Sequence, residues 1–381
     1  MIDLSCMKND QHKFFRIAMI GARSIPITVG SGGVERHVEE LSARLVTAGH
    51  QVTAYVQRKN RVPENQRGIK LVPVISVSIK GLGTLLRVFI STCRVLFSRF
   101  DIVHFHGVGP ATFAWLPRLL RPRMKVLVTF HSIDRLHAKW GRLACWYLRY
   151  GEWAALRFPH STISVSRAIQ KYCDLTYQID TIYVPNGATI SEYPGSDQLA
   201  HWGLKPDGYI LAVGRLVGQK GFHYLIDAYQ HLETDKKLVI VGGDAGGGDY
   251  ADYLRQTAAG NSNIIFTDFQ SGRMLAQLYA NAYLYIHPSE AEGLSVAILE
   301  AMAAGRCVLV SDILENREPL DHSGLTFISG DTEDLTKQLQ SLLNHPEIVT
   351  ERGARAAKWI SAEYSWERVT AMTEQVYREL F

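Results

Sequence analysis

Short apolar runs alternate with amphipathic stretches along both halves of the chain. The run at 14–21 is followed by a helical pattern of apolar positions at 35–48 and by a strand-like run at 51–56. The same succession restarts in the second half, with a strand-like run at 209–214 and a helical pattern at 222–232. A strand, a crossover helix and another strand form the repeating unit of a parallel sheet. The pattern therefore predicts an α/β protein with two parallel sheets, each covered by helices.

The two halves are separated by a turn and a polar stretch. Asn186 and Gly187 give a turn signal after the last apolar run of the first half, and residues 191–203 are polar and contain proline and glycine. Such a composition is typical of an interdomain linker. We therefore expect an N-terminal domain at 14–191 and a C-terminal domain at 192–364, followed by a last helix at 365–381.

The composition is that of an ordinary globular protein. The chain has 381 residues, of which 46% are hydrophobic and 20% charged, and this length suits two domains. The five cysteines are scattered without C-x-x-C spacing, which predicts neither a zinc site nor a disulfide framework. Residues 1–13 are polar, and no apolar run is long enough to span a bilayer. These features predict a cytoplasmic protein.

The charge is distributed unequally between the halves. Residues 1–190 hold 26 Lys and Arg against 11 Asp and Glu, a net charge of +15, whereas the remaining residues carry −11. A basic half is compatible with nucleic acid, an anionic membrane or an acidic substrate. Because no nucleic-acid recognition motif is present, we expect no nucleic-acid partner. The alternative is that this basic half is a nucleic-acid-binding module.

Two basic amphipathic segments lie in the first half, at 81–99 and 135–157. The first places its large apolar residues near one helical face and its arginines elsewhere: Leu82, Leu85, Leu86, Phe89, Cys93, Leu96 and Phe97 against Arg87, Arg94 and Arg99. The second mixes Trp140, Trp146 and Trp153 with lysine and arginine. Interleaved tryptophan and basic residues suit an anionic membrane, here the inner face of the plasma membrane. The alternative is that both are crossover helices with buried apolar faces.

Two carboxylates in the second half are the first candidates for chemistry. A strand-like run at 283–288 precedes Glu292, and helical spacing of apolar residues starts at Leu294 and continues past Glu300. The first N–H groups of such a helix attract phosphate, and the helical rise places the two carboxylates about 12 Å apart. A nucleoside diphosphate sugar has a similar layout, with hydroxyls on both sides of the diphosphate. The alternative is that Glu292 interacts with the helix dipole and Glu300 lies on an ordinary polar face.

Two cations follow the strand-like run at 209–214. Arg215 and Lys220 flank a glycine-containing turn. Fixed cations at the carboxyl end of a strand suit a diphosphate leaving group, because negative charge grows on its oxygens as the sugar–phosphate bond breaks. A basic surface loop is the alternative. No D-x-D-type motif is placed to hold a divalent ion at the diphosphate, so we expect no metal.

A glycine-rich loop and two histidines complete the candidates. Gly30, Gly32 and Gly33 precede the first helical pattern without the G-x-G-x-x-G spacing of a dinucleotide fingerprint, which disfavours NAD. His106 and His131 follow strand-like runs, at the edge where ligands bind in α/β sheets. Hydrogen-bonded structural histidines are the alternative, and no further residues stand at metal-binding spacing.

Together these motifs resemble those of a known enzyme family. The segment IHPSEAEGLSVAILEAM (286–302), the loop GGVERHV, the step TFHS and the element 214–221, which reads G-R-x-x-x-x-K-G, are similar to the signatures of the retaining, nucleotide-sugar-dependent glycosyltransferases of family 4. The resemblance covers most of the chain. It implies two Rossmann-like domains that face each other across a cleft, the GT-B fold, and a last helix that crosses back to the N-terminal domain.

The resemblance also implies roles for individual residues. Arg215 and Lys220 would neutralise the diphosphate. Glu292 would position the donor sugar, Glu300 would bind the ribose and His131 would contact the sugar near the reacting carbon. The implied set comprises the catalytic residues His131, Glu292, Arg215 and Lys220, the donor-binding residues Gly32, Gly33, Arg215, Lys220, Glu292, Gly293, Leu294, Ser295 and Glu300, and His106 and Asn186 as acceptor or sugar contacts.

The implied activity is transfer of a hexosyl group from a nucleoside diphosphate sugar, a co-substrate, to a hydroxyl of a saccharide or lipid-linked acceptor, without a cofactor or metal. The opening G-x-R-x-I-P, at 21–26, looks like a subgroup of transferases that act in cell-surface polysaccharide assembly. A nucleotide-sugar epimerase or a sugar phosphorylase on the same fold remains the alternative. An epimerase would consume the donor without acceptor, whereas a transferase would only hydrolyse it slowly.

Overall fold

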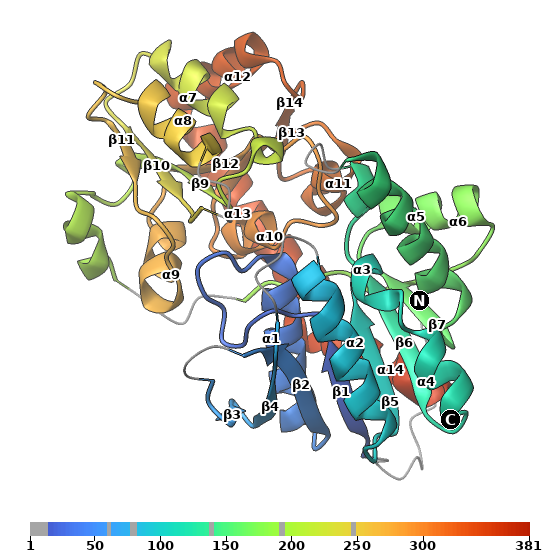
Figure 1. Ribbon diagram of the computed structural model, residues 1–381. Coiled ribbons are helices and arrows are strands. Elements are labelled where there is room, and N and C mark those ends of the chain that lie inside the picture. Colours follow the sequence, from blue (N-terminus) through green and yellow to red (C-terminus); the bar gives the residue numbers. More distant parts are fainter. Residues whose placement is uncertain (1–13, 59–61, 77–81, 137–140, 190–194, 245–248) are drawn as a thin grey trace.

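The computed structural model describes residues 14–58, 62–76, 82–136, 141–189, 195–244 and 249–381. Figure 1 shows two sheets in two halves of the molecule, with the N-terminal sheet in blue and green and the C-terminal sheet in yellow and orange. Both sheets are covered by helices, as expected for parallel strands joined by crossovers. The predicted α/β class and the arrangement as two mostly parallel sheets are confirmed.

Among the described residues the N-terminal sheet has eight strands, and the short strand β3 pairs antiparallel with β4. In spatial order they are β3 (Asn65–Gln66), β4 (Ile69–Val74), β2 (Gln51–Gln57), β1 (Arg16–Ile20), β5 (Ile102–His106), β6 (Lys125–Phe130), β7 (Ser161–Ser164) and β8 (Ile182–Tyr183). The central strands are largely apolar and buried because helices cover both of their faces, and β5 also carries two buried histidines, His104 and His106. His106 ends β5, so its side chain lies at the carboxyl edge of this sheet.

The C-terminal sheet has six strands, all in parallel pairs. In spatial order they are β11 (Ile264–Phe266), β10 (Lys237–Val241), β9 (Tyr209–Val213), β12 (Leu284–His287), β13 (Cys307–Ser311) and β14 (Leu325–Phe327). Strands β9 and β12 are neighbours although about 70 residues of chain separate them. Their carboxyl ends therefore bring the loop after β9 next to the loop after β12.

Helices connect the strands of both sheets, and those expected at 35–48 and 222–232 correspond to α1 and α7. In the N-terminal half they are α1 (Gly33–Thr47), α2 (Leu82–Leu96), α3 (Val108–Ala111), α4 (Trp115–Leu120), the 3-10 helix η2 (Asp134–Leu136), α5 (Arg142–Arg157) and α6 (Arg167–Tyr177). In the C-terminal half they are η3 (Asp197–Trp202), η4 (Gly218–Lys220), α7 (Phe222–Gln230), α8 (Asp249–Thr257), α9 (Gly272–Ala280), α10 (Val296–Ala303), α11 (Leu314–Arg317), η5 (Glu318–Leu320), α12 (Thr332–Asn344), α13 (Pro346–Glu363) and α14 (Trp366–Glu379).

The last helix, α14, packs against the N-terminal domain. Its residues Trp366, Val369 and Tyr377 share a hydrophobic core with β1 and α1. The Tyr377 hydroxyl lies 2.8 Å from Nδ1 of His104, on β5. In Figure 1 this helix, in red, lies among the elements of the N-terminal half. The two domains are thus linked by the segment before β9 and by the return of the chain through α14.

In the alternative interpretation of segment 81–99 as a crossover helix, the predicted burial of its apolar face is wrong. Phe89 and Phe97 of this segment are 44% and 91% exposed, whereas Arg87 is buried. The Arg87 guanidinium donates to the carbonyls of Ala22, at 2.5 Å, and Gly21, at 3.3 Å. These bonds compensate for burial of the charge, so helix α2 turns its arginine toward the loop after β1.

Two predicted helices have different bounds in the structure. The helical pattern from Leu294 begins two residues later, because Ser295 is the N-cap of α10. The basic segment 135–157 is divided between η2 and α5, and Trp140 lies outside the described residues. Within the described part of the chain, no helix has the length and apolar character needed to cross a membrane.

Candidate functional site

The loops after β9 and β12 bring two predicted site residues into contact. Lys220 lies in η4, and Glu292 lies in the loop before α10. The Lys220 Nζ is 2.5 Å from Oε1 of Glu292, and their side chains are 12% and 11% exposed. The sequence placed both residues at a diphosphate sugar, and the structure brings them together as a largely buried ion pair.

Glu292 is held by a short chain of hydrogen bonds. His287, at the end of β12, lies with Nε2 2.7 Å from Oε1 of Glu292, while the Tyr285 hydroxyl lies 2.8 Å from the other ring nitrogen. Because a carboxylate only accepts, Nε2 of His287 carries the proton and Nδ1 accepts from Tyr285. Burial would raise the pKa of Glu292, but the Lys220 charge and the His287 bond lower it below its usual value. The carboxylate is therefore ionised and fixed in orientation.

Arg215 faces the glycine-rich loop of the other domain. A Cβ added to Gly32 would lie 3.4 Å from Nε of Arg215, and one added to Gly33 would lie 3.7 Å from Val296 of α10. Within the described ranges, no ion pair or side-chain hydrogen bond involves Arg215. Gly32 is the N-cap of α1 and Gly33 is its first residue, so the predicted loop ends in a helix terminus. The guanidinium of Arg215, unpaired among the described residues, thus lies against the glycine backbone at the start of α1, between the two domains.

The segment around Gly293 makes close contact with the N-terminal domain. A Cβ at Gly293 would lie 1.7 Å from the carbonyl oxygen of His131, so only glycine permits this approach. The next residue, Leu294, accepts a hydrogen bond of 2.7 Å from Nδ2 of Asn186. Asn186 was predicted as an acceptor or sugar contact, and in the structure its amide bridges the two domains.

Glu300 is paired with a residue that the sequence did not single out. Its Oε1 lies 3.2 Å from Nε of Arg36, on α1, and Arg36 also lies 3.2 Å from Glu40. Burial raises the pKa of Glu300, and the Arg36 charge opposes this rise. The pair joins α1 to α10 across the domain boundary, so one oxygen of the predicted ribose ligand is already occupied in this structure.

His106 and His131 form a group with a third histidine, His37, which the sequence analysis missed. Nδ1 of His106 lies 3.2 Å from Nε2 of His131, and the ring centroids of His37 and His131 are 4.8 Å apart. We call these three side chains the histidine cluster. His37 belongs to the GGVERHV motif, four residues after Gly33, so its place one helical turn from the predicted loop was the available signal.

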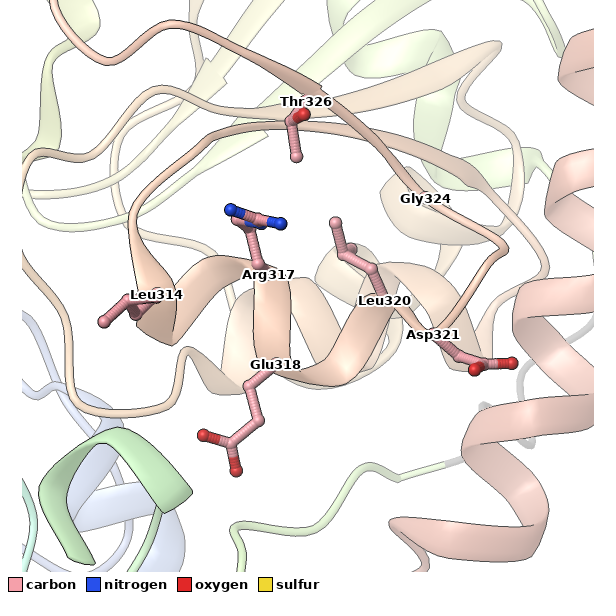
Figure 2. A pocket seen from close by; sticks show the side chains of 7 residues that line it. All are labelled: Leu314, Arg317, Glu318, Leu320, Asp321, Gly324 and Thr326. Atoms are coloured by element: carbon pink, nitrogen blue, oxygen red, sulfur yellow. The ribbon is translucent and has the colours of Figure 1, made fainter. Parts of the chain in front are cut away.

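Two cavities lie away from these residues. One, of about 450 Å³, lies between α11, η5 and the strand β14. In Figure 2 its lining residues Arg317 and Leu320 point toward Thr326, whereas Glu318 points to the opposite side of its helix. A second, of about 760 Å³, is lined by residues of the N-terminal domain between Arg16 and Phe100. Arg215, Lys220, Glu292 and Glu300 line neither cavity. The candidate site is therefore defined by its polar contacts.

Two family models match the chain. Residues 31–192 match the model described as Glycosyltransferase Family 4, and residues 207–345 match the model described as Glycosyl transferases group 1. One match falls on each domain, and the second contains Arg215, Lys220, Glu292 and Glu300.

Relatives with named activities match different lengths of the chain. The O-antigen chain mannosyltransferase B of Escherichia coli is 31% identical over 54% of this chain and 56% of its own. The phosphatidyl-myo-inositol mannosyltransferase of Mycobacterium leprae is 25% identical over 95% of this chain and 96% of its own.

Solved structures share the fold over nearly the whole chain. Sucrose-phosphate synthase from Thermosynechococcus elongatus has a TM-score of 0.83 at 22% identity and covers 96% of this chain and 99% of its own. The Anabaena protein HepE in complex with UDP-glucose has a TM-score of 0.79 at 19% identity, over 96% of this chain and 100% of its own. The two family models together match most of the chain, which therefore belongs to the family 4, group 1 glycosyltransferases, and the solved structures show that it has the GT-B fold.

Proposed function

We propose that this glycosyltransferase moves a hexosyl group, with retention of anomeric configuration, from a nucleoside diphosphate sugar to a hydroxyl of a saccharide or lipid-linked acceptor in cell-surface polysaccharide biosynthesis. The observation that carries the proposal is the convergence of Arg215, Lys220 and Glu292 beside the start of α10, opposite Gly32 and the backbone of His131. A diphosphate needs cations and N–H donors, and a sugar needs a fixed acceptor of hydroxyl hydrogen bonds.

Each group has a distinct task in this reaction. Arg215 and Lys220 neutralise the charge that develops on the leaving diphosphate, aided by the N–H groups at the start of α10. Glu292, which stays ionised beside Lys220, accepts hydrogen bonds from the donor sugar. Glu300 binds the ribose. These cations take the role of a divalent ion, so the reaction proceeds without metal or cofactor.

The comparisons support the substrate classes. A structural neighbour was solved with UDP-glucose, which favours a nucleotide sugar as donor. The relatives named for O-antigen chain and phosphatidyl-myo-inositol mannosylation favour a saccharide or lipid-linked acceptor. An acceptor of this kind is held at a membrane surface, where the net charge of +15 in residues 1–190 would be attracted to anionic lipid.

Helix α5 supplies a surface suited to such a membrane. Its residues Leu143, Trp146, Tyr150 and Trp153 are 81%, 69%, 39% and 42% exposed and recur at helical spacing. The exposed arginines of the same helix are Arg142, Arg149 and Arg157. An apolar stripe with tryptophan and neighbouring cations is typical of helices that lie in the headgroup region. We therefore place peripheral membrane contact at α5.

A nucleotide-sugar screen tests the proposed reaction. Thermal unfolding is followed with nucleoside diphosphates and nucleotide sugars, because a ligand that binds the folded state raises its stability. The stabilising donor is then incubated with and without saccharide acceptors in excess EDTA, and NMR determines the anomeric configuration of the product. We expect acceptor-dependent transfer with retention. Consumption of the donor without acceptor would indicate the epimerase, and loss of activity in EDTA would contradict metal independence.

Liposome co-sedimentation tests the membrane contact. The variant Leu143→Ser/Trp146→Ser should lose binding to vesicles that contain anionic lipid, while transfer to a water-soluble acceptor is retained. Leu314→Ser is the matched control, since Leu314 is 67% exposed on the C-terminal domain. Equal binding of both variants and the unmodified protein would show that α5 does not contact the bilayer.

A further inference from the structure

The histidine cluster gathers three metal-ligating side chains from three separate elements. His37 comes from α1, His106 ends β5, and His131 follows β6. One nitrogen of each ring lies within 4.8 Å of the other two, and the three residues are 2%, 1% and 7% exposed. The cluster is therefore compact, and His131 is its member nearest to solvent.

Hydrogen bonds at the rim of the cluster fix the state of two rings. Nδ2 of Asn186 donates to the carbonyl of Leu294, so Oδ1 of Asn186 faces His37 and can only accept from it. Nδ1 of His37 therefore carries the proton, and its Nε2 keeps a lone pair. Nε2 of His106 lies 3.4 Å from the Met19 sulfur, a weak acceptor, which favours a lone pair on Nδ1, the nitrogen that faces His131.

Partners of this kind are the outer-shell contacts that orient histidines at metal centres. The neighbouring His104 has no such free nitrogen, because its ring nitrogens lie 2.8 Å from the Tyr377 hydroxyl and 2.7 Å from the Thr129 hydroxyl. His104 is therefore not counted as a member of the histidine cluster.

The electrostatics also suit a metal ion that binds imidazole. Burial lowers the pKa of His37 to about 4 and holds the pKa values of His106 and His131 well below the usual range. The rings are neutral at pH 7, and a neutral imidazole is the form that binds Zn²⁺.

The distances fit zinc after a small contraction. Nitrogens that bind Zn²⁺ tetrahedrally at 2.0–2.1 Å lie roughly 3.3 Å from one another. The His106–His131 separation of 3.2 Å already matches this value, and the ion would displace the proton that Nε2 of His131 donates to His106. The upper limit of 4.8 Å requires a shift of about 1.5 Å at most. Three histidines leave a fourth position for water, as in zinc sites that keep one open position.

We propose that His37, His106 and His131 form a binding site for a divalent transition-metal ion of the Zn²⁺ class, and that the bound ion inhibits the enzyme. The inhibition rests on the proposed function and on the role that the family resemblance implies for His131, contact with the donor sugar near the reacting carbon. The ion takes a ring nitrogen of His131, and the backbone carbonyl of the same residue packs against Gly293 in the candidate site. Donor sugar and metal should therefore compete. The site holds no catalytic ion, so this proposal agrees with transfer that needs no metal.

Metal binding is measured first without any substrate, so that its outcome is independent of the glycosyltransferase reaction. Untagged protein is titrated with Co²⁺, a spectroscopic substitute for Zn²⁺, and equilibrium dialysis gives the Zn²⁺ stoichiometry. We expect one ion per chain and the intense visible absorption of tetrahedral Co²⁺. In the donor-dependent assay, Zn²⁺ should raise the apparent KM for the nucleotide sugar.

Three variants separate the site from adventitious binding. Loss of an outer-shell partner typically weakens metal affinity about 10- to 100-fold, and we expect an effect of this size on Zn²⁺ affinity for Asn186→Ala. His37→Gln removes a ligand and should weaken the affinity for Zn²⁺ by more than this. His322→Gln is the control, because His322 is exposed. Thermal unfolding verifies that each variant folds. Binding unchanged by His37→Gln, a stoichiometry of zero or an octahedral Co²⁺ spectrum would overturn the proposal. One bound ion without inhibition would overturn its second half alone.

Discussion

The ion pair of Lys220 and Glu292 predicts that stability and transfer respond differently to the loss of one charge or of both. The two side chains are about one-tenth exposed and their charged atoms lie 2.5 Å apart. Lys220→Met keeps most of the aliphatic side chain and removes the cation. Glu292 then remains buried with His287 as its hydrogen-bond donor. The variant therefore isolates the effect of an uncompensated carboxylate.

The expected magnitudes separate the two readouts. Breaking a buried pair by removing one partner costs about 3–5 kcal/mol of unfolding free energy. The double variant Lys220→Met/Glu292→Gln removes the remaining charge and should regain most of this loss. Transfer should behave otherwise, because losing one preorganised charge contact lowers kcat about 100- to 1,000-fold. The double variant should therefore be stable and still inactive.

Urea unfolding at pH 7 and initial rates of transfer measure these effects on the same preparations. Arg255→Met is the control, since Arg255 pairs with Asp268 at 3.0 Å on the surface, where an ion pair contributes up to about 1 kcal/mol. If Lys220→Met loses no more stability than Arg255→Met, the pair is not the buried contact described above. Normal transfer by the double variant would refute the catalytic assignment.

Three further predictions concern the domain boundary. Gly293→Ala places a methyl group against the carbonyl of His131 and should push the two domains apart. We expect kcat/KM to fall about 10- to 100-fold and small-angle scattering to show a larger particle. An unchanged particle size and activity would show that the domains do not meet here in solution. Burial lowers the pKa of His37 to about 4, so on acidification the unfolded state binds a proton at a higher pH than the folded state does. The stability against urea should therefore be full above about pH 6.5 and decline toward pH 4. His37→Gln should make this decline smaller. Glu318 accepts from the N–H of Arg167 at the start of α6, at 2.8 and 2.9 Å, and Glu318→Gln should cost about 1 kcal/mol of unfolding free energy, whereas an unchanged urea midpoint would contradict this bond.

Local patterns in the sequence predicted much of the fold. The strand-like run at 209–214 and the apolar run before Glu292 became neighbouring strands because parallel strands joined by crossovers align their carboxyl ends. This rule alone placed Arg215, Lys220 and Glu292 at one edge of one sheet. Helical periodicity, however, did not identify the buried face of α2, since the bonds of Arg87 to the loop carbonyls outweighed the apolar pattern.

The contacts between the domains could not be predicted in this way. Arg36 and Glu300 are 264 residues apart, and nothing in the periodicity of either helix indicates that α1 and α10 meet. The contact of His37 with the other two histidines could not be predicted for the same reason. The spacing of residues on α1 does not show which strand ends lie beside the ring of His37. Residues that act within one loop can be identified from spacing, whereas residues that act across two domains require the packed structure.

In the proposed reaction Glu292 would contact both Lys220 and the donor sugar, and its hydrogen bonds allow both contacts. Lys220 and His287 both bind Oε1, and among the described residues no side chain bonds to Oε2. A diphosphate that attracts Lys220 would therefore leave Oε1 with its bond to His287, and the carboxylate would keep its orientation. Oε2 remains able to accept from a sugar hydroxyl throughout. Since Tyr285 in turn holds the ring of His287, the proposed position of the sugar would be set by a buried strand of the C-terminal domain.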